Sequence, residues 1–90
     1  MVLVFPPVYA RAEPPPGSMR SAAEAACRAQ VRTVLATHGL SAVVDWRNGR
    51  PETANPDLFF DQTHYRLPLA RTLTTEIAAA IVRLRTHMTE

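Results

Sequence analysis

The sequence has no lysine, so its ten basic residues are all arginines, set against eight acidic residues for a formal net charge of +2. The two signs are interspersed along the chain, whereas a nucleic-acid-binding protein gathers its cations on one face. Such a face would need Arg28, Arg32, Arg47 and Arg50 to converge, and the helical phase of the first two argues against it. We predict that the chain binds no nucleic acid.

The chain also lacks long apolar runs and has a single cysteine. Cys27 cannot form an internal disulfide, and its place among alanines in a helical pattern predicts a small buried side chain. Residues Met1 to Phe5 are apolar but carry no basic region and stop at Pro6, so they do not resemble a signal sequence. No run approaches the length that crosses a bilayer, and we predict no membrane contact for this segment.

Two short apolar runs, residues 1–5 and 41–45, predict buried strands. Their apolar residues are continuous rather than alternating, which is typical of strands covered on both faces. Amphipathic helices are predicted at 18–38 and 67–87. A strand, helix and strand of these lengths predict a parallel pair joined by a right-handed crossover. We therefore predict an α/β fold in β-α-β-α order.

The helix patterns also predict which side chains face the core. Ser18 or Ser21 begins the first helix, the latter through a capping box with Glu24, and Gly39 is placed to end it. Its predicted inward stripe is Met19, Ala23, Cys27, Val31 and Leu35, with Arg20, Glu24, Arg28 and Arg32 facing outward. The second helix begins around Pro68, and its predicted stripe is Leu69, Leu73, Ile77, Ala80, Ile81 and Leu84.

These elements fall short of a complete sheet. Two strands leave both edges of a parallel sheet unpaired, so residues 1–90 are predicted to be a single incomplete domain. We expect upstream residues or another chain to pair with the exposed strand edge. Residues 46–66 form a long loop, and long loops in compact domains are commonly functional.

Asp61 and His64 in this loop are the candidate catalytic residues. Their spacing places a carboxylate where it can accept a hydrogen bond from an imidazole, which orients the ring and leaves its other nitrogen to act as a base. By itself the spacing is equally typical of a capping Asp beside an exposed His. Asp45 and Trp46 follow the second strand, at the sheet edge where α/β sites assemble, although a strand-ending Asp is more often a turn residue.

The run from Asp57 to Arg66, Asp-Leu-Phe-Phe-Asp-Gln-Thr-His-Tyr-Arg, resembles the last conserved block of SGNH/GDSL-type hydrolases. It is most similar to the hydrolase-like branch found in bacterial envelope proteins, where an aromatic run precedes D-x-x-H and Tyr follows the His. The preceding strand, helix and strand agree with the order of elements in that family. The resemblance implies the C-terminal part of a flavodoxin-like three-layer α/β sandwich.

The resemblance further implies a serine-dependent hydrolase or acyltransferase acting on acyl esters, including acylated carbohydrates, without a cofactor. His64 would be the general base and Asp61 its orienting carboxylate. The family's nucleophile and oxyanion-hole blocks have no counterpart here, and the three serines, Ser18, Ser21 and Ser41, are predicted to be cap or turn residues. Losing one oxyanion donor alone costs about a hundredfold in rate, so we predict an inactive chain. A bacterial envelope location would follow if an upstream part carried a signal or anchor.

Two other interpretations stay open. Asp57, Asp61 and His64 could ligate a metal, although no second His or Cys clusters with them. The chain could also be a non-enzymatic interaction or structural module in which His64 is structural. That interpretation predicts a self-sufficient fold in which residues 2–5 are paired and covered.

Overall fold

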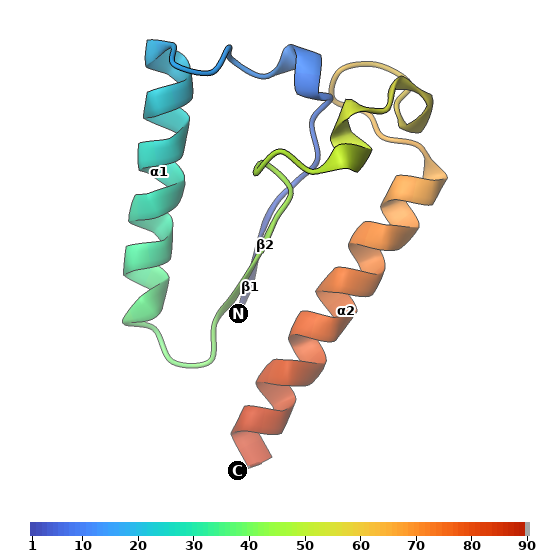
Figure 1. The fold of residues 1–90 in the computed structure, drawn as a ribbon. Helices are drawn as coiled ribbons and strands as arrows, with labels where there is room; N and C mark the ends of the chain where they lie inside the picture. Colours follow the sequence, from blue (N-terminus) through green and yellow to red (C-terminus); the bar gives the residue numbers. More distant parts are fainter. Residues whose placement is uncertain (90) are drawn as a thin grey trace.

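The chain folds as a mixed α/β structure in the predicted order of elements (Figure 1). The computed structural model describes residues 1–89, with side chains described through residue 86. Its elements are β1 (Val2–Phe5), α1 (Met19–Ala36), β2 (Ala42–Asp45) and α2 (Leu67–Thr89). Short 3₁₀ helices at Ala10–Ala12, Pro51–Ala54 and Pro56–Leu58 lie in the connections, so the loop of residues 46–66 is partly regular.

The two strands pair in parallel, as predicted. Val2 lies opposite Ala42 and Phe5 opposite Asp45, so the carboxyl ends of both strands lie at the same end of the sheet, here called its carboxyl edge. The ladder continues one step beyond β2, where Trp46 N donates to Phe5 O at 3.0 Å. Helix α1 makes the crossover between the strands, which a parallel connection requires. The segments that follow β1 and β2 therefore both begin at this carboxyl edge.

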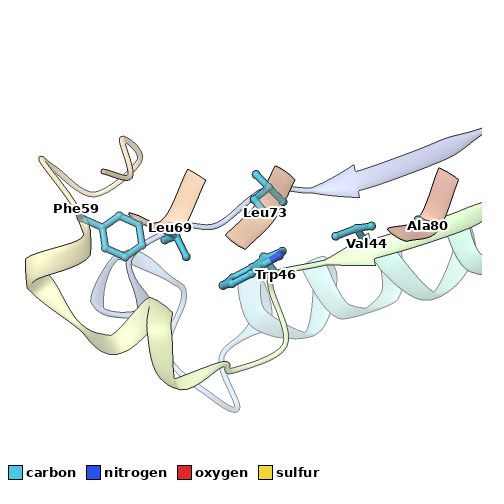
Figure 2. Close-up of a cluster of buried hydrophobic side chains, with 6 residues drawn as sticks. All are labelled: Val44, Trp46, Phe59, Leu69, Leu73 and Ala80. Carbon is cyan, nitrogen blue, oxygen red and sulfur yellow. The ribbon is translucent and has the colours of Figure 1, made fainter. Parts of the chain in front are cut away.

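The core lies between the sheet and α2 (Figure 2). Alternation along β2 turns Val44 and Trp46 toward α2, where Leu69 and Trp46 are 1% and 0% exposed. Burial of a side chain of this size stabilises the fold by roughly 1.5–3 kcal/mol. The buried apolar residues are Val44, Trp46, Phe59, Leu69, Leu73 and Ala80. Ile81, predicted to lie in the stripe of α2, is instead 40% exposed, because the stripe passes through Ile77 and Ala80.

Helix α1 lies on the other side of the sheet from α2 (Figure 1) and buries none of its residues. Its predicted inward stripe is wrong for Met19, Ala23 and Cys27, which are exposed, whereas Val31 and Leu35 are half-buried. Met19 is 90% exposed and Cys27 is exposed, so the prediction of a buried thiol is also wrong. The half-buried positions are Ser21, Glu24, Arg28, Val31 and Leu35. The contacts of Glu24 and Arg28 on this face with Arg47 and Asp45 are ion pairs.

The ends of α1 also differ from the pattern. Ser18 is the N-cap, and its hydroxyl accepts from Ser21 N at 3.2 Å, so a capping box starting at Ser21 is wrong. The helix ends at Ala36, and the left-handed residue beyond it is Leu40, with φ 58°, rather than Gly39. A leucine in that conformation costs roughly 1–2 kcal/mol. The bend is therefore imposed by the pairing of β2 with β1 and not by a glycine.

Candidate active site

The loop of residues 60–64 is closed by hydrogen bonds at its base. Phe59 and Tyr65 form an antiparallel bridge, and Phe60 N donates to His64 O at 2.8 Å. Arg66 N donates to Leu58 O at 2.7 Å, just outside the bridge. These bonds return the chain on itself within a few residues. Asp61 and His64 therefore sit on a tight loop that α2 follows directly.

This loop is fastened to the segment that leaves β1. Tyr9 N donates to Gln62 O at 2.9 Å. The rings of Tyr9 and Phe59 lie 5.5 Å apart in a tilted arrangement, and Phe59 is buried in the core. The loop thus lies on the side of the molecule where both strands end (Figure 1). The structure places Asp61 and His64 at the carboxyl edge of the sheet.

Asp61 and His64 are joined by a two-point hydrogen bond. His64 Nδ1 lies 2.7 Å from Asp61 Oδ1 and 2.8 Å from Oδ2. Asp61 Oδ1 also accepts from the backbone N–H groups of Thr63 at 2.9 Å and His64 at 3.0 Å. The Thr63 N–H, followed by the His64 side chain, lowers the pKa of Asp61 below its ordinary value. The carboxylate is therefore ionised at neutral pH and can accept a hydrogen bond from the Nδ1–H group of His64.

The remaining ring nitrogen of His64, Nε2, has no hydrogen-bond partner within residues 1–89. The His64 side chain is 72% exposed and that of Asp61 is 60% exposed. A carboxylate on Nδ1 holds the proton there and leaves the Nε2 lone pair free to accept one. This arrangement is the one that a general base and its orienting carboxylate would need, and it is open to solvent.

No hydroxyl in the described part of the chain is set against Nε2. Ser18 caps α1, and Ser41 lies 2.7 Å from His38 Nδ1 at the start of β2. Thr63 Oγ1 is 3.3 Å from His64, but from Nδ1, the nitrogen that Asp61 already holds. No hydroxyl group of the described residues is therefore placed to give a proton to Nε2 of His64.

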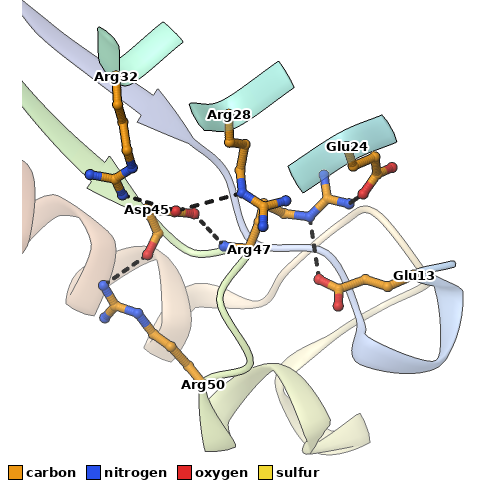
Figure 3. Close-up of polar contacts among 7 residues, drawn as sticks. All are labelled: Glu13, Glu24, Arg28, Arg32, Asp45, Arg47 and Arg50. Atoms are coloured by element: carbon orange, nitrogen blue, oxygen red, sulfur yellow. Dashed lines mark hydrogen bonds and ion pairs between the residues drawn. The ribbon is translucent and has the colours of Figure 1, made fainter. Parts of the chain in front are cut away.

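Asp45, the other acidic candidate, lies in a cluster of ion pairs between β2 and α1 (Figure 3). Its side chain is 9% exposed, and Oδ2 accepts from Arg32 at 3.1 Å. Its Oδ1 accepts from Arg47 N at 2.8 Å, which makes it a turn residue as well. The charged residues of this Asp45 cluster are Glu13, Glu24, Arg28, Arg32, Asp45 and Arg47.

The four arginines named above do not share one surface, because Arg28 and Arg32 come from α1 whereas Arg50 lies over Trp46 on the side of α2. Arg28, Arg32 and Arg47 meet in the Asp45 cluster, and Arg50 donates to Asp45 O at 3.1 Å. Four carboxylates share these contacts, from Asp45 and three glutamates at positions 13, 24 and 76. These arginines therefore provide no local excess of positive charge of the kind that phosphate binding needs.

Trp46, also flagged by its place after β2, is a core residue. It is fully buried, and its Nε1 has no hydrogen-bond partner. The guanidinium of Arg50 lies 4.0 Å from its ring centroid and is held by Glu76 at 2.7 and 2.8 Å. Glu76 also raises the pKa of Arg50 above its ordinary value. Trp46 and Arg50 thus connect the loop to α2 and offer no group to a substrate.

The metal-site interpretation of the loop finds no support among the described residues. Among residues 1–89, no three His, Cys, Asp or Glu side chains gather as a metal site, so Asp57 does not join Asp61 and His64 as a ligand set. Neither described helix combines the length and apolarity of a membrane span. No family model, curated protein or solved structure matches the chain.

Proposed function

We propose that this chain is the C-terminal part of a serine acyl-ester hydrolase or acyltransferase of the SGNH type. His64 supplies the general base and Asp61 its orienting carboxylate. The observation that carries the proposal is the hydrogen bond of His64 Nδ1 to both oxygens of Asp61, at 2.7 and 2.8 Å, with Nε2 turned to solvent. The pair lies near the carboxyl ends of the parallel strands, where α/β enzymes assemble their sites.

The surrounding architecture is consistent with a larger sandwich. Helices lie on both sides of the two-strand sheet (Figure 1), which is the layering of a flavodoxin-like fold. The two strands leave both outer edges of this sheet open for further parallel strands. We propose that such strands bring a serine, with its oxyanion-hole donors, to Nε2 of His64. The substrate is then an acyl ester, such as an acylated carbohydrate.

Chemically, the pair moves one proton. The serine hydroxyl would give its proton to Nε2 as its oxygen attacks the ester carbonyl, and the imidazolium would pass it to the departing alcohol. Asp61 stays ionised throughout and stabilises the imidazolium through Nδ1. Its lowered pKa suits that task, because a carboxylate that protonated readily would release the ring.

A second candidate function has its own observation. Asp61 Oδ1 accepts from two backbone N–H groups of its own loop, those of Thr63 and His64. These bonds shape the loop without any chemistry and are typical of an Asx turn. A small interaction or structural module would use Asp61 in this way alone and leave His64 as an exposed partner.

The first test is hydrolysis of a short-chain aryl ester by the purified chain, beside its His64→Ala variant. His38→Ala is the matched control, because His38 also bonds a neighbouring side chain through Nδ1. The proposal expects no serine-dependent turnover and equal rates for all three. Turnover lost only with His64 would show that a serine of this chain, or of a second copy, completes the site.

The catalytic role is tested in a protein that joins this chain to a segment carrying the nucleophile. Asp61→Asn is expected to lower kcat by up to about ten-thousandfold with little loss of folding, as replacing the carboxylate of a catalytic triad does. Full activity of that variant would remove Asp61 from the mechanism and favour the structural module.

A further inference from the structure

A hollow lies between α1 and the carboxyl ends of the strands, separate from the loop of Asp61 and His64. It has a volume of about 160 Å³ and is lined by Phe5, Glu24, Cys27, Arg28 and Arg47. An engineered apolar cavity of about 150 Å³ holds benzene, so this space suits one ring or a short acyl chain. Ligands of parallel α/β sheets bind at this edge.

Arg28 is the cation in this wall with donors to spare. Its nearest partner is Asp45, with Nε 3.8 Å from Oδ2, which is too long for a hydrogen bond. Arg32 already donates to that oxygen at 3.1 Å (Figure 3). None of the N–H groups of Arg28 has an acceptor in the described part of the chain, although its side chain is only 24% exposed.

The other charges of the wall are already paired. Arg47 donates to Glu24 at 2.8 Å and to Glu13 at 3.3 Å, so it neutralises Glu24 within the hollow and has less to offer a ligand. The Asp45 cluster as a whole balances three arginines against three carboxylates. A doubly charged phosphate would be repelled by those carboxylates, whereas a single negative charge can be accepted by one free guanidinium.

We propose that this hollow binds a small monocarboxylate with an apolar body, either an aryl acid or a short-chain acid. The carboxylate would pair with the planar N–H fork of Arg28, which matches its two oxygens. The apolar body would lie against Phe5 and Cys27. This site does not depend on the function proposed for Asp61 and His64.

Cys27 provides the readout, because its thiol lines the hollow and is open to reagents. The rate of its alkylation by iodoacetamide, a neutral reagent, is measured by mass spectrometry with and without benzoate, at constant ionic strength. A ligand of this size binds with a Kd on the order of 1 mM. Benzoate at several times that concentration is expected to slow alkylation several-fold, whereas benzamide, its uncharged analogue, leaves the rate unchanged.

Two arginine variants test the assignment. Arg28→Gln is expected to abolish the protection by benzoate. Arg20→Gln removes the same charge from the same helix, but Arg20 neither lines the hollow nor contacts Asp45, so this variant is expected to keep the protection. Arg28→Lys keeps the positive charge but lacks the planar N–H fork, so it should weaken the protection by benzoate. It replaces Arg28→Gln as the test if circular dichroism shows that Arg28→Gln is unfolded. Absence of protection in the native chain, equal protection by benzamide, or undiminished protection in folded Arg28 variants would overturn the proposal.

Discussion

Replacing Leu73 with alanine should remove much of the stability of this fold. Leu73 is 7% exposed and belongs to the cluster in which α2 covers Val44 and Trp46 (Figure 2). Truncating a buried leucine costs about 2–5 kcal/mol, through lost burial and the cavity left behind. A chain of this length has a total stability of roughly 5–13 kcal/mol. Leu73→Ala is therefore expected to lower the urea midpoint by a large fraction.

Ile81→Ala is the matched control, because Ile81 lies on the same helix but is 40% exposed. Less burial is lost there, and alanine has the higher helix propensity, so the expected cost is below about 1 kcal/mol. Unfolding is followed by the fluorescence of Trp46, the single tryptophan of the chain, which is fully buried. Equal midpoints for the two variants would refute the packing of α2 described above.

Three further predictions concern polar contacts. Because the pKa of Asp61 is lowered in the folded chain, the ionised carboxylate stabilises the fold, and this contribution is complete above the unfolded pKa of about 3.9. It is lost as the pH falls through the folded pKa. The difference in unfolding free energy between the native chain and Asp61→Asn, measured by urea titration, should therefore shrink below about pH 4. Arg50→Gln should lower the unfolding free energy by about 1–3 kcal/mol, because it removes two charged hydrogen bonds to Glu76. Glu76→Gln removes the same bonds and should cost a similar amount. The double variant should therefore cost less than the sum of the two single variants. Ser18→Ala should cost about 0.5–2 kcal/mol as the loss of an N-cap, whereas Ser21→Ala should cost much less, and thermal unfolding by circular dichroism separates the two.

The order of elements could be predicted from the sequence because the apolar patterns of both strands and of α2 are strong. Residues 2–5 and 42–45 are short continuous apolar runs that only pairing can satisfy. In α2, Leu69, Leu73 and Ala80 keep one helical phase and are buried as that phase predicts. In α2 local pattern and tertiary packing agree. The strands pair as predicted, but they were expected to be covered on both faces, and β1 and the first half of β2 are only half-buried.

The rotation of α1 could not be predicted in the same way. Its small residues, such as Ala23 and Cys27, gain little from burial and do not fix which face of the helix turns toward the sheet. The ion pairs of Arg28 and Arg32 with Asp45 lie on another face. A signal was present: two arginines one helical turn apart, and an acidic residue at the end of the following strand. Those partners are far apart in sequence, and only the parallel crossover brings them together.

Within the candidate site, the contact between Asp61 and His64 follows from local spacing and was predictable. The attachment of their loop to Tyr9 was not, because it joins segments at opposite ends of the chain through backbone groups that carry no sequence signature. That attachment is what places the pair at the carboxyl edge of the sheet.

The tautomer of neutral His64 is the decisive measurement for its proposed role as a base oriented by Asp61. Nitrogen-15 NMR of the ring distinguishes a proton on Nδ1 from one on Nε2, and His38 in the same spectrum is an internal comparison. We expect that neutral His64 carries its proton on Nδ1, from which it donates a hydrogen bond to Asp61, and that Asp61→Ala removes this preference. A neutral His64 protonated on Nε2 in the folded chain would contradict the assignment of His64 as a base oriented by Asp61.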